Sequence, residues 1–196
     1  MKALVLIGVL VVILAIVGGV LGGTYNSLVK KSTAIDAQWA QVETQYQRRY
    51  DLIPNLVNSV KGYMTQEKTI FDNLAAARTK YGSATTTDAK AVAGGELETA
   101  LSRLLVVMEN YPVLRSVEVI TSLMDELAGT ENRISVERGR FNDAVMAYNT
   151  TIKTFPGVMM AGMFGFNPKP YFTATAGAEA PPKVEFNFSR PAATRP

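Results

Sequence analysis

The feature that most constrains this chain is an uncharged apolar stretch near its start. Residues 3–23 carry no charged side chain, and after the first residue they read LVLIGVLVVILAIVGGVLGG. A helix of this length, rising about 1.5 Å per residue, can cross the roughly 30 Å hydrocarbon core of a bilayer. The alternative is a cleaved signal peptide, because Lys2 precedes the stretch and Val20 and Gly22 are small enough for a cleavage site. The stretch is longer than the apolar part of a typical signal peptide, so residues 1–23 are predicted to be a retained transmembrane anchor.

The charges that flank this anchor leave its orientation open. Lys2 and the terminal amine lie on one side, and Lys30 and Lys31 lie on the other. An excess of positive charge marks the cytoplasmic side of a membrane segment, but here the two sides are nearly balanced. The chain is therefore predicted to be a single-pass membrane protein whose larger part lies on an undetermined side.

After the anchor, apolar residues recur at alternating spacings of three and four. The first series is Tyr25, Leu28, Ile35, Trp39, Val42, Tyr46, Ile53, Leu56, Val60 and Tyr63, with Ser32 and Arg49 at the heptad positions that are not apolar. This spacing is typical of helices that pack side by side in bundles. The phase continues across Pro54, so the proline is predicted to kink one helix rather than divide it.

Two shorter helices are predicted next. The first covers about residues 66–81 and is followed by a loop with the sequence GSATTTD. Thr87 or Asp88 can cap the second, which is expected to run to Asn110 before a proline stops it. The adjacent glycines Gly94–Gly95 are expected to weaken its first turns.

The fourth predicted helix, from near Ser116 to Phe155, has the longest periodic series. Its heptad positions are Val117, Ile120, Met124, Leu127, Glu131, Ile134, Arg138, Phe141, Val145, Tyr148, Ile152 and Phe155. Residues 24–155 are therefore predicted to form an all-α domain, an up-down-up-down four-helix bundle with long first and last helices. In this arrangement the last helix returns antiparallel along the first and ends near the bilayer.

The two long helices can be placed in register by matching their ends. This match pairs Tyr25 with Phe155 and sets Arg49 opposite Glu131. We expect Arg49 to bond Glu131 between the two helices, with Arg138 nearby. Buried ion pairs of this kind often fix the register of helices rather than add net stability.

Beyond the predicted bundle the chain changes character. The stretch FPGVMMAGMFGF is uncharged and too short to span a bilayer. Residues 156–166 are interpreted either as a lid over the end of the bundle or as an interfacial helix that touches the membrane. The side chains that would make this membrane contact are Phe155, Met159, Met160, Met163 and Phe164.

The last part of the chain, residues 167–196, is rich in proline, alanine and threonine and is predicted to be poorly ordered. Alternation of apolar and polar residues around Val184–Phe188 favours a short strand, and Tyr171–Thr175 could also be extended. A strand in an otherwise helical chain needs another edge to pair with, and another tail is the simplest candidate. This is a hint of self-association.

The composition excludes several kinds of chemistry. The chain contains no cysteine and no histidine, so it has no thiol nucleophile, no disulfide and none of the commonest general bases and metal ligands. No phosphate-binding loop or nucleophile elbow is found. The net charge of +3 comes from scattered residues, unlike the basic footprint of a nucleic-acid-binding protein. We therefore predict no catalytic residue, cofactor, metal site or nucleic-acid partner.

One polar cluster, QRRYDLIPNLVNSVKGYM, interrupts the apolar pattern of the first helix. Arg49 lies on the heptad face, whereas Arg48, Asp51 and Asn55 project to neighbouring faces at helical spacing. A catalytic role would need a nucleophile or base beside these groups, and the sequence offers none. The cluster is therefore interpreted as structural.

The dispersed motifs together resemble the LemA family. They are YNSLV at 25–29, Trp39, RRYDLIPNLVNSVKGY at 48–63, AR at 77–78, ENYP at 109–112, TENRI at 130–134, YNTTIKTFP at 148–156, GF at 165–166, and the PYF and PKVEF pieces of the tail. The resemblance marks Tyr25, Asn26, Trp39, Arg48, Asp51, Pro54 and Asn55 as family-motif residues. One departure is Gln66, where many members have histidine, and it argues against a metal or proton-transfer role there.

The resemblance implies a bacterial single-pass protein of the cytoplasmic (inner) membrane, with a four-helix bundle and no established activity. Its members are often encoded near a membrane zinc metalloprotease. We therefore expect a protein that is not an enzyme and acts by interaction, as a homo-oligomeric scaffold or adaptor of the cell envelope. The alternatives are an accessory or regulator of a membrane enzyme such as a zinc protease, and a membrane-remodelling protein.

Overall fold

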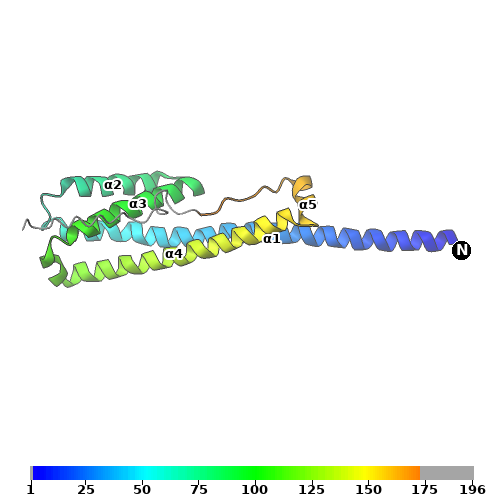
Figure 1. The fold of residues 1–196 in the computed structure, drawn as a ribbon, viewed down its shortest axis with the longest axis horizontal. Helices are drawn as coiled ribbons and strands as arrows, with labels where there is room; N and C mark the ends of the chain where they lie inside the picture. Colours follow the sequence, from blue (N-terminus) through cyan, green and yellow to red (C-terminus); the bar gives the residue numbers. More distant parts are fainter. Residues whose placement is uncertain (1, 173–196) are drawn as a thin grey trace, which may run out of the picture.

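The computed structural model describes residues 2–172, and within them the chain is helical without a β-strand (Figure 1). The elements are α1 (Lys2–Val60), α2 (Lys68–Ser83), α3 (Thr87–Met108), the 3-10 helix η1 (Pro112–Ser116), α4 (Glu118–Lys153) and α5 (Gly157–Phe164). The prediction of an all-α chain with an apolar N-terminal helix is confirmed for this part of the protein. The possible strand around Phe186 lies outside the described residues.

The predicted anchor and the first predicted bundle helix form one continuous helix. α1 contains 59 residues and continues through Pro54, so at about 1.5 Å per residue it is close to 90 Å long. The predicted boundary at residue 23 therefore falls inside a helix. The large apolar side chains between Leu4 and Val20 are all exposed, by 47 to 74%. This part of α1 is long and apolar enough to cross a membrane, and it is the one helix among the described residues that is.

The core of the protein lies along the contact between α1 and α4, which run in opposite directions (Figure 1). Fully buried side chains alternate from the two helices, at the heptad positions that the apolar pattern predicts. They include Leu28, Ile35, Val42, Ile53 and Leu56 from α1 and Ile120, Leu127, Ile134, Val145 and Ile152 from α4. Burial of these side chains, each contributing about 1.5–3 kcal/mol, gives the pair its stability.

The α2–α3 hairpin lies along the half of this pair that is remote from the anchor (Figure 1). The Tyr46 and Tyr81 rings are 5.6 Å apart, and Lys90 pairs with Glu43. A side chain at Gly94 would not fit, because its Cβ would lie 2.6 Å from the Tyr46 ring. Gly94 was expected only to weaken the first turns of α3, but its missing side chain allows the hairpin to pack closely against α1.

Several helix ends differ from the predicted ones. The cap of α3 is Thr86, whose hydroxyl accepts a hydrogen bond from the Ala89 N–H, rather than Thr87 or Asp88. The fourth helix ends at Lys153, because the backbone of Thr154 is extended. Phe155 is therefore not a core residue, and 78% of its surface is exposed. Tyr25, which we expected opposite Phe155, packs instead against the Phe164 and Phe166 rings.

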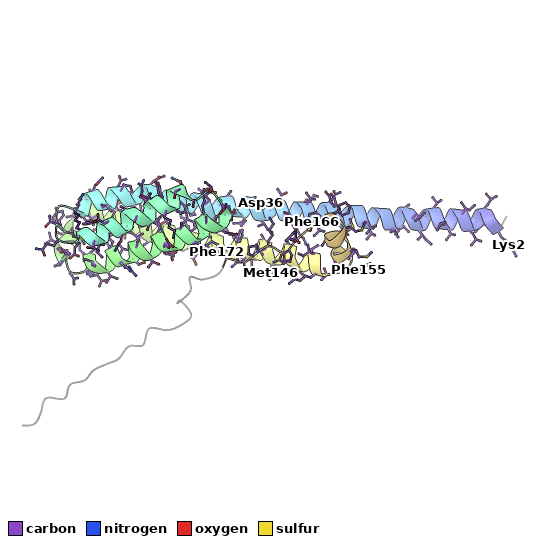
Figure 2. All side chains as sticks on the ribbon, turned by 90° about the horizontal axis from the view of Figure 1, so that it is seen from above. Lys2, Asp36, Met146, Phe155, Phe166 and Phe172 are labelled. Carbon is purple, nitrogen blue, oxygen red and sulfur yellow. The ribbon has the colours of Figure 1, made fainter. Side chains whose placement is uncertain are left out.

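A segment that the sequence predicts to be poorly ordered is held against α4. Residues 167–172, named here the C-terminal strap, run from α5 back along the half of the α1–α4 pair that the hairpin leaves uncovered (Figures 1 and 2). The strap is extended and makes its hydrogen bonds with side chains of α4. The prediction of poor order, made from the composition of residues 167–196 as a whole, is therefore wrong for residues 167–172, because the contacts that hold this segment are non-local.

The close approach at Gly94 can be tested by adding one methyl group. We expect Gly94→Ala to lower the free energy of unfolding by about 1–3 kcal/mol, because the buried Tyr46 ring would have to move. The matched control is Gly139→Ala in α4, where nothing lies within 4 Å of the new Cβ. This change should stabilise the protein by up to about 1 kcal/mol through helix propensity. Denaturant unfolding in detergent micelles measures both, and equal effects would contradict the proposed contact.

Candidate functional site

A buried arginine in the last quarter of α1 joins this helix to α4. Arg49 is only 1% exposed, and its Nη2 lies 2.5 Å from a carboxylate oxygen of Glu131. Its Nε donates to the hydroxyl of Thr130, which itself donates to the Leu127 carbonyl. The two residues that the register argument set opposite each other are thus bonded in the structure. An arginine buried at this depth needs such partners, because an unpaired buried charge is strongly destabilising.

Arg138 belongs to a second network rather than to this pair. It donates to Glu98 of α3 at 2.7 Å and to the hydroxyl of Tyr46, and its guanidinium lies 4.7 Å from the Phe172 ring centre. Burial raises the pKa of Tyr46, although the bond from Arg138 opposes this effect. Burial also lowers the pKa of Arg138, but its bonds to Tyr46 and Glu98 outweigh that and leave the pKa raised. At neutral pH the network therefore holds a neutral phenol and a charged guanidinium.

The networks around Arg49 and Arg138 connect secondary-structure elements and contain no reactive group. Arg138 connects α1, α3, α4 and the strap, while Arg49 connects α1 with α4. Neither network contains a nucleophile beside a base, which is the arrangement that covalent catalysis requires. Within residues 2–172 no group of three or more acidic side chains is placed to hold a metal ion.

The family-motif residues separate into an inner and an outer set. Trp39 is half-buried and packs against the rings of Phe141 and Phe172, and Pro54 is half-buried in α1. Asn26 is exposed near the anchor. Tyr25, also near the anchor, packs against the Phe164 and Phe166 rings. Arg48, Asp51 and Asn55 lie on the outer surface of α1.

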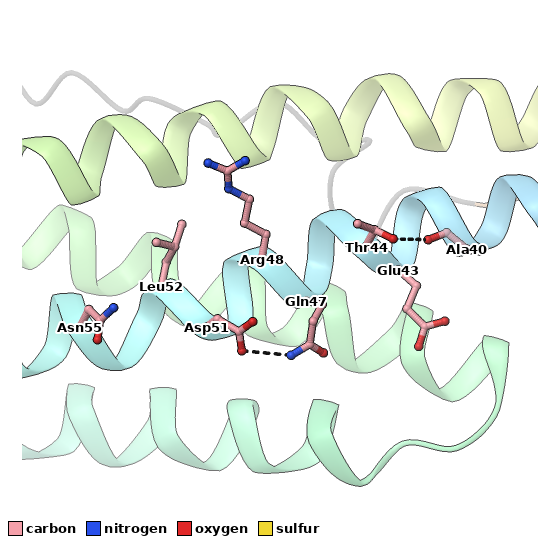
Figure 3. A pocket seen from close by; sticks show the side chains of 8 residues that line it. All are labelled: Ala40, Glu43, Thr44, Gln47, Arg48, Asp51, Leu52 and Asn55. Carbon is pink, nitrogen blue, oxygen red and sulfur yellow. Dashed lines mark hydrogen bonds between the residues drawn. The ribbon is translucent and has the colours of Figure 1, made fainter.

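This outer surface carries an open groove of about 710 Å³ (Figure 3). The residues that line it are Ala40, Glu43, Thr44, Gln47, Arg48, Asp51, Leu52 and Asn55. Within it Gln47 donates a hydrogen bond of 3.0 Å to Asp51. The groove combines small residues with one basic and two acidic side chains, so it can accept another polar surface but holds no reactive group. We name it the α1 groove.

Two asparagines of α4 hold the strap by its backbone. The Asn149 side chain donates to the Lys169 carbonyl and accepts from the Lys169 N–H, at 2.8 and 2.9 Å. Asn142 makes the same pair of bonds with Phe172, at 3.0 and 2.7 Å. The spacings match, because seven residues of helix rise about 10.5 Å and three residues of extended chain cover about 10 Å. Each asparagine side-chain amide thus makes the pair of hydrogen bonds that a neighbouring β-strand would otherwise make with the strap backbone.

Sequence reasoning missed this contact, although a signal was present. Asn142 and Asn149 are one heptad apart and lie directly beside the core residues Phe141 and Tyr148. Tyr148 adds a fifth bond to the strap, from its hydroxyl to the Asn167 carbonyl. Asparagine residues are usually exposed to solvent or placed in turns, so the binding of the strap backbone by Asn142 and Asn149 could be recognised only once the position of the strap was known.

The short helix α5 packs one side against the base of the α1–α4 pair. Met160 is only 4% exposed, so it is not one of the membrane-contacting residues that the interfacial interpretation included: it packs between α5 and the two long helices. Met159, Met163 and Phe164, with Phe155 before the helix, are exposed by 52 to 78%. The apolar stretch therefore has a covered inner side and an uncovered outer side.

The ion pair between the long helices predicts a loss of stability on neutralisation. We expect Glu131→Gln to lower the free energy of unfolding by about 1–3 kcal/mol, because a buried arginine would lose a charged hydrogen-bond partner. Glu126→Gln, at an exposed position of the same helix, is the matched control and should change little. Unfolding in detergent micelles followed by circular dichroism compares them. If the two variants unfold alike, the pair does not hold the register.

The asparagine contacts predict local changes in hydrogen exchange. Asn149→Ala should speed exchange of the Lys169 amide, and Asn142→Ala that of the Phe172 amide, because each loses its acceptor. With a bond worth about 1 kcal/mol in net free energy, exchange should rise by roughly fivefold. Exchange of amides in the middle of α4 is the internal control. Unchanged rates at Lys169 and Phe172 would contradict the bonding of the strap.

Comparison with known proteins gives this architecture a family. The chain is similar to the magnetosome proteins MamQ 1 and MamQ 2 of Paramagnetospirillum magneticum (strain ATCC 700264 / AMB-1), at 29% identity over 183 residues, with 80% of this chain and 67% of each relative covered. It is 27% identical over the same length to the magnetosome protein MamQ of Magnetospirillum gryphiswaldense (strain DSM 6361 / JCM 21280 / NBRC 15271 / MSR-1), with the same shares covered. The model of the LemA family matches residues 38–186, most of the chain, so this protein belongs to the LemA family.

Proposed function

We propose that this protein is a membrane-anchored, non-catalytic scaffold of the bacterial cell envelope that works by self-association in the cytoplasmic membrane. The observation that carries the proposal is the outer surface of α1. That surface has a regular pattern and an open groove, yet no other element of residues 2–172 covers it. Neither the two arginine networks nor the groove offers reactive chemistry, which favours binding over catalysis. The names of the MamQ relatives denote no enzyme activity either.

The outer surface of α1 repeats with the spacing of a helix-packing face. Its members, Thr33, Ala37, Ala40, Thr44, Gln47 and Asp51, alternate at intervals of four and three and are all exposed. Alternation of this kind brings side chains onto one stripe of a helix, and small residues at its centre permit close approach of a second helix. The stripe lies on the side of α1 that faces away from the core, so it supports a contact with another molecule.

Membrane anchoring restricts how two copies can meet. Copies held by the same membrane stand parallel, so their α1 helices would run in the same direction around a two-fold axis. Arg48 and Asp51 are then about 4.5 Å apart along the axis, and the long arginine side chain of one copy can reach the carboxylate of the other. Charge complementarity of this kind supports a specific parallel contact.

The same surface is open to a different partner. A membrane enzyme such as a zinc protease would also approach parallel to α1, and the protein would then act as its accessory or regulator. The small polar side chains of the α1 groove fit a second copy better than an apolar partner, because an enzyme contact of comparable size usually has an aromatic centre. We therefore favour self-association.

The contact can be tested with single cysteines, because the chain has none of its own. We expect Thr44→Cys to form a disulfide-linked dimer under mild oxidation in native membranes, since Thr44 lies at the centre of the stripe. Thr79→Cys is the matched control. Thr44 and Thr79 are both exposed helical threonines whose hydroxyls bond the carbonyl four residues earlier, but Thr79 lies on α2.

The possible outcomes separate the alternatives. A dimer from Thr44→Cys but not from Thr79→Cys supports self-association through α1. An adduct of Thr44→Cys with a different protein, without a dimer, favours the accessory role and overturns the scaffold. Equal dimer yields from both variants would indicate random collisions in the membrane and would also remove the proposal.

A further inference from the structure

The outer side of α5 is an exposed apolar surface. It consists of Phe155, Val158, Met159, Met163 and Phe164, with exposed fractions of 78, 49, 52, 71 and 55%. No charged residue occurs between Lys153 and Lys169. Single exposed apolar residues are common, but a contiguous group of large ones marks a surface that binds another apolar phase. We name this group the α5 outer face.

The backbone around α5 keeps this face in one orientation. Gly157 at the start of α5 is buried, and a Cβ there would lie 1.9 Å from the Thr151 carbonyl oxygen. At the other end, Gly165 adopts a φ of 73°, which lets the chain reverse into the strap. Between these ends Met160 anchors the inner side. The helix is therefore fixed at both ends, and its apolar outer side does not result from loose packing.

The position of α5 identifies what the outer face meets. α5 lies beside α1 where the apolar part of that helix ends (Figures 1 and 2). Tyr25, two residues beyond the predicted anchor, packs 4.9 Å from Phe164 and 5.8 Å from Phe166. If residues 4–23 fill the hydrocarbon core, this aromatic cluster lies at the membrane–water interface, where tyrosine side chains are enriched.

Basic side chains lie on the bundle side of this cluster. Lys30 of α1 and Lys153 of α4 are exposed, and Lys31 reaches the Thr151 hydroxyl at 2.5 Å. From the membrane outwards, the order is therefore an apolar helix, an aromatic and methionine-rich layer, and three lysines. A bilayer presents the matching sequence of hydrocarbon, interface and phosphate groups.

We propose that the α5 outer face inserts into the interface of the same bilayer that holds α1. The occupant is a lipid surface, with the lysines facing the headgroup phosphates. The protein then has two membrane contacts, the α1 span and α5, and the tilt of the helices is restricted because α5 meets the bilayer to one side of the α1 axis. The strap, bonded to α4 directly after α5, keeps the second contact attached to the bundle. This insertion does not depend on self-association.

A depth measurement on the full-length chain tests the insertion. Single cysteines at Val158 and Met163 are labelled with the environment-sensitive dye NBD and reconstituted into phosphatidylcholine–phosphatidylglycerol vesicles. The control is Val136→Cys in α4, because Val136 and Val158 have nearly equal exposed fractions of 52 and 49%. Val136 is close to Arg138, which bonds Tyr46, so it lies about 30 Å beyond the anchor.

We expect labels at 158 and 163 to emit at shorter wavelength than the label at 136. Lipids with a nitroxide near the carbonyl end of the acyl chain should quench them several-fold more strongly. Emission and quenching equal to those of the control would overturn the insertion. So would a blue shift at 158 and 163 that occurs in native membranes but not in vesicles of the purified chain, because a protein would then cover the face. The Thr44 disulfide is formed on a different surface, so either proposal can fail alone.

Discussion

The antiparallel contact between α1 and α4 supports every other feature of this protein. It buries the heptad residues of both helices and holds Arg49 against Glu131 and Thr130 at its middle. A shift of one helical turn would separate the arginine from both partners and leave a buried charge unpaired, which costs several kcal/mol. The apolar contacts supply most of the attraction, and the polar pair selects one register among those that the apolar pattern would tolerate.

Different elements cover different parts of this helix pair. The α2–α3 hairpin lies over the half remote from the anchor, where Gly94 admits the Tyr46 ring. The strap lies over the other half and satisfies its backbone through Asn142 and Asn149. Arg138 connects the hairpin with the strap, since it bonds Glu98 of α3 and stacks against Phe172 of the strap. The hairpin and the strap are thereby coupled through the half-buried guanidinium of Arg138.

Much of the fold could be predicted from periodicity, and the errors have a common cause. Apolar spacing located the long helices and most of their buried residues, because each helix has one face that must leave water. It failed at Phe155, where the helix has ended, and it made no prediction for Met160, because beyond the helix the phase no longer says which side is covered. Phe155 proved exposed and Met160 buried, and the neighbours that decide this lie in α1 and α4.

The candidate sites show the same difference between what the local sequence pattern predicts and what tertiary packing decides. The polar cluster of α1 was correctly expected to follow helical geometry, but only packing showed that Arg49 is enclosed while Arg48, Asp51 and Asn55 line an open groove. The order and spacing of the residues alone determined that this chain has an apolar first helix and further long amphipathic helices, and its composition excludes thiol and imidazole chemistry, because these properties depend on local residue type and spacing. Tertiary structure decided which surfaces stay uncovered and why a proline-rich segment is ordered. Those outcomes depend on groups far apart in the chain, whose backbone bonds form only after the long helices have packed.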